Sequence, residues 1–157
     1  MAMTKLKAYL DENKVRYLTI THSPAYTSQK TAASAHVPGK ELAKTVIVKV
    51  DGQLAMAVLP GSYQVDFGQL KEVVGASKVE LASEDDFRDT FSDCEVGAMP
   101  PFGNLYNMPV YVAEALTEDE EIAFNACSHT ELIRMSYEDF SRLVQPTVVK
   151  FAATSRV

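Results

Sequence analysis

The sequence predicts a mixed α/β (α+β) fold, with one compact domain over residues 1–157 and a curved, mostly antiparallel sheet flanked by helices. Two observations carry this prediction. Short runs rich in β-branched and aromatic residues alternate with short amphipathic segments that begin at Ser, Thr or Asp. No repeat, low-complexity stretch or linker divides the chain. With 46% hydrophobic and 23% charged residues, the composition excludes disordered and fibrous proteins.

The first expected elements are a helix, a strand and a second helix. Thr4 can cap a helix that ends near Asn13, and residues 15–21 are rich in the residue types that favour strands. A turn-like loop that contains His22 follows. A helix of small residues is then expected over residues 29–36.

The clearest expected element is a β-hairpin. Residues 43–50 and 53–59 are two strand-like runs joined by Asp51-Gly52, a dipeptide that two-residue hairpin turns favour. The second run is apolar on both faces. This pattern predicts a central strand that is covered on both sides.

Three further helices and five short strands complete the expected order. The helices should begin after Asp66, Ser83 and Ser136, because each of these residues precedes an amphipathic segment and can cap it. The expected strands are residues 78–81, 109–114, 122–127, 131–135 and 147–151.

Lys44 is the most informative single residue. Because side chains alternate along a strand, Lys44 shares a face with Val46, Val48 and Val50. One interpretation is a lysine that extends its charge off the end of the strand. The other is a fixed positive charge beside an apolar pocket, suited to a phosphate, a carboxylate or a developing oxyanion.

The loop GAMPPFG at residues 97–103 is a second candidate site. Its two prolines fix the backbone and remove two N–H donors, and its glycines permit tight turns and close approach to a ligand. Two interpretations are open. The loop is rigid and binds no ligand, or it presents its remaining N–H groups to a carbonyl.

Cys94, Cys127 and His129 raise the question of a metal or thiol site. Their spacing matches no structural zinc pattern, so neither a metal nor a cofactor is predicted. A nucleophilic Cys–His pair two residues apart has poor geometry and lacks an orienting third group. His129 either lines a pocket or lies in a solvated turn. The two cysteines are expected to be free thiols in a reducing cytosol.

The net charge is −6, from 15 basic and 21 acidic residues. It argues against a general nucleic-acid coat protein, because non-specific affinity comes from Lys and Arg that neutralise phosphates. The net charge does not exclude transient binding of one end of a nucleic acid. Residues 1–14 are polar, and no run approaches the ~20 apolar residues of a membrane span. A cytoplasmic protein without membrane contact is expected.

Several motifs, taken in order between about residues 6 and 145, resemble the YbaK/ProX family. This family comprises the free-standing relatives of the editing domain of bacterial prolyl-tRNA synthetases. The motifs are HSPAYT at 22–27, AKT at 43–45, DG at 51–52, GAMPPFG at 97–103, SHT at 128–130 and IRM at 133–135. The resemblance implies a compact α/β hydrolase that cleaves the ester between a wrong amino acid and tRNA, without a metal or a protein nucleophile.

The resemblance also implies roles for individual residues. Lys44 matches the functional lysine of the family and is the expected catalytic residue. The expected substrate-binding residues are Thr45, Gly97, Ala98, Met99, Pro100, Pro101 and His129, with His22 as a further candidate. The implied partner is aminoacyl-tRNA, bound through its terminal adenosine and aminoacyl group, with a synthetase as a second partner. The candidate substrate is tRNA for proline that carries a small amino acid.

One position departs from the family pattern. Cys127 stands where the family often has glycine, and a side chain there would narrow the pocket or alter the turn. This departure supports an alternative function, a non-catalytic module that binds an amino-acid-like ligand, a tRNA end or a synthetase. A thiol or metal enzyme built on Cys127 and His129 is a third hypothesis.

Overall fold

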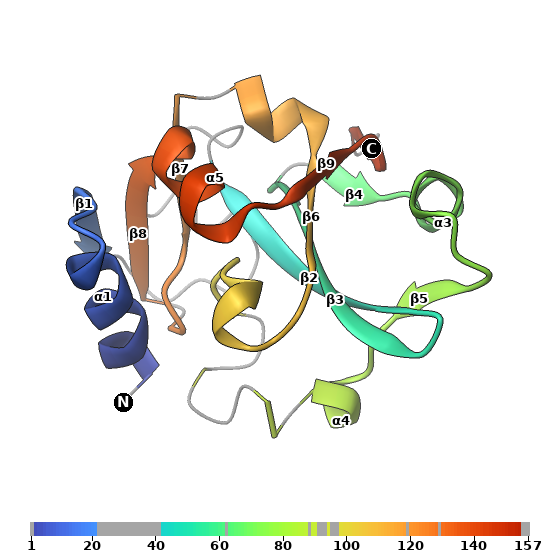
Figure 1. Cartoon of the computed structure of the whole chain (residues 1–157), viewed down its shortest axis with the longest axis horizontal. Helices are drawn as coiled ribbons and strands as arrows, with labels where there is room; N and C mark the ends of the chain where they lie inside the picture. The colour runs from blue at the N-terminus through green and yellow to red at the C-terminus, as the bar shows by residue number, and fades with distance from the viewer. Residues whose placement is uncertain are drawn as a thin grey trace.

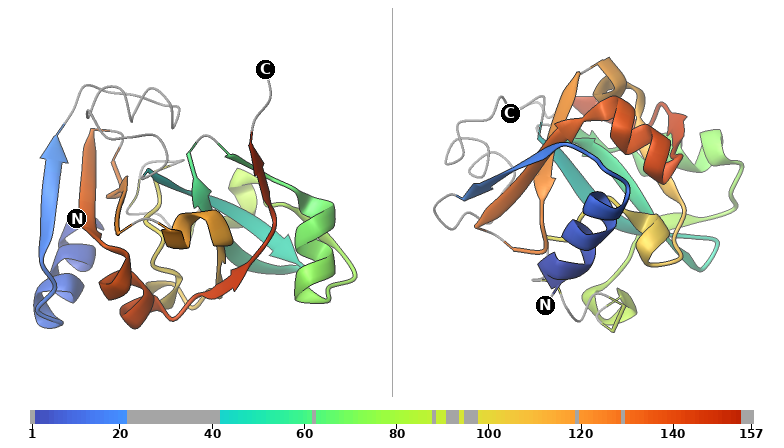
Figure 2. Two further views of the ribbon diagram at one scale, coloured as in Figure 1. Left: turned by 90° about the horizontal axis from the view of Figure 1, so that it is seen from above. Right: turned by 60° about the vertical axis from the view of Figure 1, so that its left-hand side comes forward.

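The protein, described by a computed structural model, has two larger sheets with helices around them (Figures 1 and 2). The residues that the structure describes are 2–21, 42–61, 63–87, 89–90, 94, 98–118, 120–128 and 130–154. The helix expected over residues 29–36 lies outside these ranges.

The described strands form three sheets. The three-stranded sheet has the order β1-β8-β7, with the strands Tyr17–Thr21, Glu131–Ser136 and Glu121–Asn125. The five-stranded sheet has the order β5-β2-β3-β6-β9, with the strands Val79–Leu81, Ala43–Val50, Gln53–Pro60, Val110–Ala113 and Thr147–Val149. A two-stranded ribbon pairs β10 with β4, which are Ala152–Thr154 and Tyr63–Val65. The β3–β6 and β6–β9 pairs are parallel and the other described pairs are antiparallel.

The predicted fold class is confirmed, with the difference that the strands divide among three sheets instead of one. Leu42, which precedes β2, makes a parallel bridge to Ala123 of β7. The chain then pairs along its whole length with β3, from Ala43 opposite Pro60 to Val50 opposite Gln53. Among the described residues, this isolated bridge joins the start of β2 to the three-stranded sheet.

The β2–β3 hairpin is formed as predicted. Asp51 and Gly52 both have positive φ angles, of 50° and 86°, which the two-residue turn requires. The Asp51 carboxylate accepts hydrogen bonds from the backbone N–H groups of Ser77 and Lys78, at 2.9 and 2.8 Å. β3 is buried from Ala55 onward and lies between β2 and β6, so the prediction of a central strand is confirmed.

Two of the predicted helix caps are seen directly in the hydrogen bonds. The α-helices of the described residues are α1 at Ala2–Glu12, α3 at Phe67–Val74, α4 at Glu84–Phe87 and α5 at Tyr137–Val144. The Asp66 carboxylate accepts from the Gln69 N–H at 3.0 Å, and the Ser136 hydroxyl accepts from the Asp139 N–H at 3.1 Å. Thr4 is not a cap, because α1 already includes Ala2.

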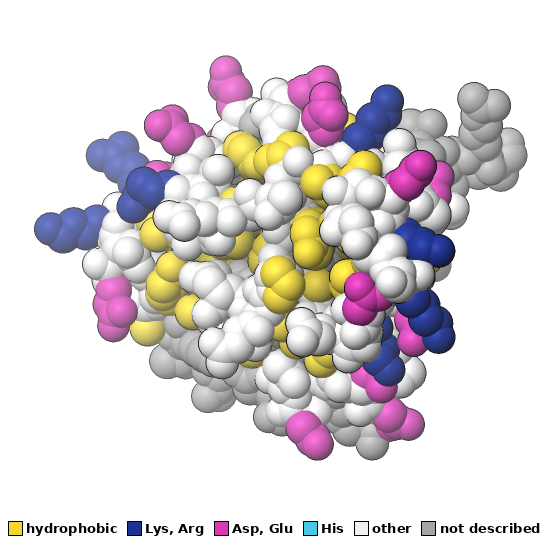
Figure 3. Space-filling model, turned by 45° about the vertical axis from the view of Figure 1, so that its right-hand side comes forward, with side chains coloured by type: hydrophobic (Ala, Val, Ile, Leu, Met, Phe, Trp, Pro, Cys, Tyr) yellow, Lys and Arg dark blue, Asp and Glu magenta, His cyan; other side chains and the backbone are white. Residues whose placement is uncertain are grey.

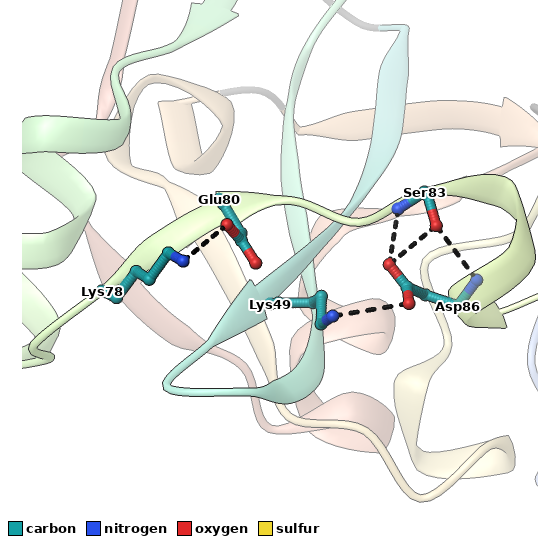
Figure 4. Close-up of polar contacts among 5 residues, drawn as sticks. All are labelled: Lys49, Lys78, Glu80, Ser83 and Asp86. Atoms are coloured by element: carbon teal, nitrogen blue, oxygen red, sulfur yellow. Dashed lines mark hydrogen bonds and ion pairs between the residues drawn. The ribbon is translucent and has the colours of Figure 1, made fainter.

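The third predicted cap, before α4, is reciprocal (Figure 4). The Ser83 N–H and hydroxyl donate to one Asp86 carboxylate oxygen at 2.8 and 2.9 Å, and the Asp86 N–H donates to the Ser83 hydroxyl at 3.3 Å. The other carboxylate oxygen of Asp86 accepts from Lys49 at 3.4 Å. The hydrogen bonds from Ser83 contribute most to lowering the pKa of Asp86, and the bond from Lys49 lowers it further.

The main hydrophobic core, here called the inner core, joins the two larger sheets. Its members include Val58 of β3 and Phe124 of β7, together with Leu10 of α1 and Phe140 of α5. A second cluster on the other face of β2 and β3 packs against Leu70 of α3. A third cluster consists of Leu42, Ala123 and Leu132, with Ile20 packed against it. We call this group the edge cluster, because it lies where β2 meets β7.

The end of the chain differs from the prediction of one strand over residues 147–151. β9 pairs with β6 and ends at Val149, and β10 begins after the fully buried Phe151. The Phe151 carbonyl oxygen accepts from the Asp66 N–H at 2.7 Å. Burial of Phe151 therefore coincides with a change of sheet between β9 and β10.

Candidate functional site

Lys44 lies near the start of β2 and is half-buried. It sits directly opposite Leu59 of β3, whose side chain has no exposed surface. Burial disfavours the charged form of an amine, and it lowers the pKa of the Lys44 ammonium from its usual 10.5. The charge of Lys44 is therefore partly removed from water.

Lys44 differs from two nearby lysines in having no counter-ion within the described parts of the chain. Lys49, on the opposite face of the same strand, pairs with Asp86 at 3.4 Å, and Lys78 pairs with Glu80 at 3.2 Å (Figure 4). Burial is the cause of the lowered pKa of Lys44. A partly desolvated cation without a carboxylate beside it is suited to stabilise negative charge on a bound ligand.

The β7 strand links Lys44 to the loop 98–103. The Leu42–Ala123 bridge aligns the start of β2 in parallel with β7, so Lys44 lies beside the end of β7. The turn after β7 then contacts the loop, because the Cys127 N–H donates to the Ala98 carbonyl oxygen at 2.9 Å. The structure therefore brings Lys44 and Ala98 to the same end of one strand.

The loop 98–103 is buried and held from several sides. Ala98 and Phe102 have no exposed surface, and Pro100 and Pro101 are also buried. A Cβ atom at Gly103 would lie 2.5 Å from the Met108 carbonyl oxygen, so only glycine fits without a shift of the backbone. Because the two prolines lack N–H groups, Ala98 and Met99 supply the backbone donors of residues 98–101.

Two predicted substrate-binding residues face away from Lys44. Thr45 shares a face of β2 with Ala43 and Ile47, both members of the inner core, and the Met99 side chain packs in that core. The Thr45 hydroxyl is buried, and it has no hydrogen-bond partner in the described structure. The Met99 side chain therefore packs in the core, and its predicted substrate-binding role stays a prediction. The unpaired hydroxyl keeps Thr45 a candidate.

His22, Gly97 and His129 lie outside the described residues, and their predicted roles stay predictions. The residues that flank position 129 are described. The Ser128 and Thr130 hydroxyls are 2.8 Å apart, and the Thr130 N–H donates to the Ser128 hydroxyl at 3.1 Å. These bonds connect the two residues on either side of position 129.

The expectation of two free thiols is wrong, because Cys94 and Cys127 form a disulfide. The two residues are 33 positions apart, so their proximity depends on the contact between the turn after β7 and the loop at Ala98. With the cysteines paired, they no longer indicate a reducing compartment. The bond also removes the free Cys127 thiol that the hypothesis of a thiol enzyme requires.

Cys127 adopts the backbone conformation that a glycine would adopt. Its φ angle is +68°, in the left-handed region that side chains other than Gly, Asn and Asp rarely occupy. The departure from glycine at this position therefore keeps the shape of the turn, and it adds a covalent bond to the loop that carries Ala98.

Reduction of the Cys94–Cys127 disulfide is expected to lower the free energy of unfolding by about 2–4 kcal/mol, because the bond closes a loop that the unfolded chain would otherwise sample freely. Denaturant unfolding with and without dithiothreitol measures this change. A double variant, Cys94→Ser with Cys127→Ser, should unfold at the same denaturant concentration under both conditions. Two titratable thiols in the unreduced, unfolded wild type would contradict the pairing.

Two hollows lined by described residues contain no predicted site residue. The larger, of about 830 Å³, is lined by Glu120, Glu121, Ser136, Tyr137, Glu138, Ser141 and Arg142. Its three glutamates would repel phosphates. The smaller, of about 230 Å³, is lined by Tyr63, Ala113, Glu114, Ala115, Glu118, Lys150, Phe151 and Ala152. Figure 3 shows one face on which Lys and Arg lie at the edges among Asp and Glu, without a continuous basic surface.

Asn125 is a polar residue near Lys44 in the strand register that the sequence analysis did not single out. It is the last residue of β7, between Phe124 and Ala126, both of which are fully buried. Its side-chain oxygen is buried and has no hydrogen-bond partner in the described structure. The sequence does contain a signal for it. Asn125 interrupts the apolar run of residues 122–126, and asparagine is disfavoured inside strands.

The comparisons with known sequences agree with one another. The model of the aminoacyl-tRNA editing domain matches residues 22–143. The chain is 30% identical to the multifunctional Ser/Thr-tRNA deacylase ProXp-y of Escherichia coli (strain K12), over 96% of this chain and 93% of the relative. It is 28% identical to a proline–tRNA ligase of Bacillus mycoides (strain KBAB4), over 64% of this chain and 17% of the ligase.

Solved structures share the fold. The hypothetical protein APE2540 superposes with a TM-score of 0.84 at 20% identity, over 95% of this chain and 99% of that protein. A protein proposed to be a trans-editing enzyme for prolyl-tRNA synthetase superposes with a TM-score of 0.83 at 15% identity, over 97% of both chains. Within the described ranges, no helix has the length and apolar character needed to cross a membrane. Since the family model covers most of the chain and the Escherichia coli relative is matched over nearly its whole length, the chain belongs to the aminoacyl-tRNA editing domain family of deacylases, which hydrolyse misacylated tRNA.

Proposed function

We propose that this protein is a trans-editing aminoacyl-tRNA deacylase, which hydrolyses the ester between a wrong amino acid and the terminal adenosine of a tRNA. The observation that carries the proposal is the position of Lys44. Its half-buried amine has no counter-ion in the described chain, and it lies at the same end of β7 as Ala98 of the buried loop. A positive charge, together with backbone N–H donors on a rigid loop, can stabilise an ester oxyanion.

The reaction needs little from the protein beyond placement and charge. A water oxygen bonds to the ester carbonyl carbon, the carbonyl oxygen becomes an oxyanion, and the bond from carbon to the ribose oxygen then breaks. The proton that water gives up finishes on the ribose oxygen, so a free amino acid and a tRNA hydroxyl are released. In the proposed mechanism Lys44 stabilises the oxyanion, and the Ala98 and Met99 N–H groups orient the aminoacyl group.

A small amino acid is the proposed cargo. A pocket excludes larger side chains by contact, whereas it rejects smaller ones poorly. The names of two relatives support this choice, since one is a Ser/Thr-tRNA deacylase and the other a proline–tRNA ligase. We therefore propose tRNA for proline that carries a small amino acid as one substrate, and tRNA esters of Ser and Thr as others. Because the protein is acidic, a synthetase is the proposed partner for tRNA delivery.

The alternative of a binding module without turnover was based on Cys127 in place of glycine. The left-handed φ angle of Cys127 keeps the turn as glycine would shape it, so this departure does not by itself argue against catalysis. Tight binding of mischarged tRNA without release of the amino acid would favour the alternative.

A panel of mischarged tRNAs tests the proposal. The protein is mixed with tRNA for proline charged with Ala, Cys, Ser or Pro, and with Ser- and Thr-charged cognate tRNAs, and release of the amino acid is followed. The expected result is faster release from at least one small non-cognate ester than from Pro-tRNA, with no loss in EDTA. Rates equal to spontaneous hydrolysis on every ester would overturn the deacylase assignment.

The pH dependence of the reaction should report the lowered pKa of Lys44. The oxyanion role requires the ammonium form, so the rate should fall as pH rises through that pKa, which lies below 10.5. The unfolded chain holds the Lys44 proton up to about 10.5, so the contribution of this group to stability increases with pH in the same interval. A fall in rate without loss of stability therefore separates titration from unfolding.

The measurement is a deacylation profile from which spontaneous alkaline hydrolysis of the ester is subtracted at each pH. The variant Lys44→Arg is the control, since guanidinium stays charged throughout this range. Its remaining activity should show no such fall. An identical alkaline fall in Lys44→Arg would assign the titration to another group.

A further inference from the structure

We infer that Asn125 is a substrate-binding residue, whose side-chain oxygen accepts a hydrogen bond from a hydroxyl of the aminoacyl-tRNA bound at Lys44. This inference rests on the proposed function and adds to it a contact on the substrate. Two observations on the described structure carry it, an unpaired buried oxygen and a strand face shared with Lys44, together with the hydrogen-bonding chemistry of the two side chains.

The Asn125 oxygen is buried without a partner in the described chain. A buried polar atom that forms no hydrogen bond costs about 1–3 kcal/mol of stability, so native proteins contain few of them. An apolar residue at this position, between Phe124 and Ala126, would avoid that cost. A bound ligand that donates a hydrogen bond to this oxygen provides the missing partner.

The strand register places Asn125 on the face of Lys44. Asn125 lies directly opposite Leu132 of β8, and Ala123, two residues earlier, bridges Leu42. Leu42, Ala123 and Leu132 pack together in the edge cluster, so their side chains lie on one side of the sheet. Because side chains two residues apart in a strand share a face, Lys44 and Asn125 both belong to this side.

The pair selects the kind of group that binds. An asparagine oxygen only accepts hydrogen bonds, and an ammonium only donates them. The α-ammonium of an aminoacyl group would satisfy Asn125 but would be repelled by Lys44. A hydroxyl satisfies both, because it donates to Asn125 and accepts from Lys44. An aminoacyl-tRNA offers two such groups at its end, the free hydroxyl of the terminal ribose and the side-chain hydroxyl of Ser or Thr.

The variant Asn125→Ala tests the inference in the full chain. We expect kcat/KM for the best ester in the panel to fall at least tenfold, while the denaturant midpoint does not fall, because the lost oxygen has no partner to leave unpaired. Asn125→Leu, which has similar volume and no acceptor, should lose the same activity if alanine opens a cavity. Asn13→Ala is the matched control, because it also removes an asparagine side chain. The Asn13 amide donates to the Tyr9 carbonyl oxygen at 2.8 Å, and both residues are far from Lys44 in sequence.

A comparison of substrates shows which hydroxyl of the aminoacyl-tRNA Asn125 contacts. An equal loss on Ala- and Ser-charged tRNA, which disappears when the tRNA ends in 2′-deoxyadenosine, assigns the contact to the ribose. A loss on Ser- and Thr-charged tRNA, with Ala-charged tRNA unaffected, assigns it to the amino acid. Wild-type turnover with an unchanged rate in both Asn125 variants would overturn the inference alone. Absence of wild-type turnover on every ester would instead overturn the proposed function on which it rests.

Discussion

Replacing Lys44 with alanine is expected to lower kcat for deacylation by about 100- to 1,000-fold, the usual loss when one group that stabilises an oxyanion is removed. The change should act on kcat more than on KM, because the oxyanion exists in the transition state and not in the bound ester. The thermal midpoint should stay the same or increase, since the variant no longer keeps a partly desolvated charge.

The matched control for this variant is Lys49→Ala on the same strand. Lys49 faces the other side of β2 and pairs with Asp86 at the surface, so its removal should leave kcat within about twofold of wild type. Single-turnover rates on the best ester of the panel compare the two variants. If Lys44→Ala raised KM alone, the lysine would bind the tRNA end without acting on the oxyanion. Equal rates in wild type and Lys44→Ala would remove Lys44 from the mechanism.

Replacing Phe102 with alanine is expected to lower the free energy of unfolding by about 3–5 kcal/mol, the range for a large aromatic side chain in a packed core. Phe102 has no exposed surface, and its ring lies 5.5 Å from that of Phe124, 5.6 Å from that of Phe140 and 6.2 Å from that of Tyr9. These partners belong to β7, α5 and α1. One side chain of the Gly-Pro loop therefore joins three elements that are distant in sequence.

Denaturant unfolding of Phe102→Ala measures this loss. Leu81→Ala is the control, because Leu81 is 63% exposed on β5 and its removal should change stability by less than about 0.5 kcal/mol. Deacylation by folded Phe102→Ala should also be slower than that of wild type, because the ring anchors the loop that carries Ala98 and Met99. A loss of stability below about 1 kcal/mol would show that the loop is held without this ring.

Much of the local structure could be predicted because its signals are local. The Asp51-Gly52 turn, the Asp66 cap and the Ser136 cap each depend on a few consecutive residues, and all three form as predicted. Lys44 could also be singled out, since a charged residue on a valine-rich face is visible in the strand pattern alone. The edges of strands and the start of α1 were less predictable, because packing decides them.

The rest of the site depends on contacts between distant segments. No local sequence pattern around Cys94 or Cys127 predicts that they pair, because 33 residues separate them. The turn after β7 brings them together. The inferred role of Asn125 depends on its position on the same face as Lys44. The bridge between Leu42 and Ala123 sets the strand register that gives this position. A one-residue change of register there would turn Asn125 to the opposite face.

The sequence by itself determined the α/β class, the β2–β3 hairpin, the starts of α3, α4 and α5 and the choice of Lys44 as a candidate, because turn residues, caps and side-chain alternation act over a few residues. It did not predict β4 or β10. The tertiary structure alone decided the division into three sheets, the disulfide and the face that Lys44 and Asn125 share. The disulfide joins residues 33 positions apart, and the bridge that sets the shared face joins Leu42 to Ala123. The free energy of such pairing between distant segments depends on the packing of the whole domain.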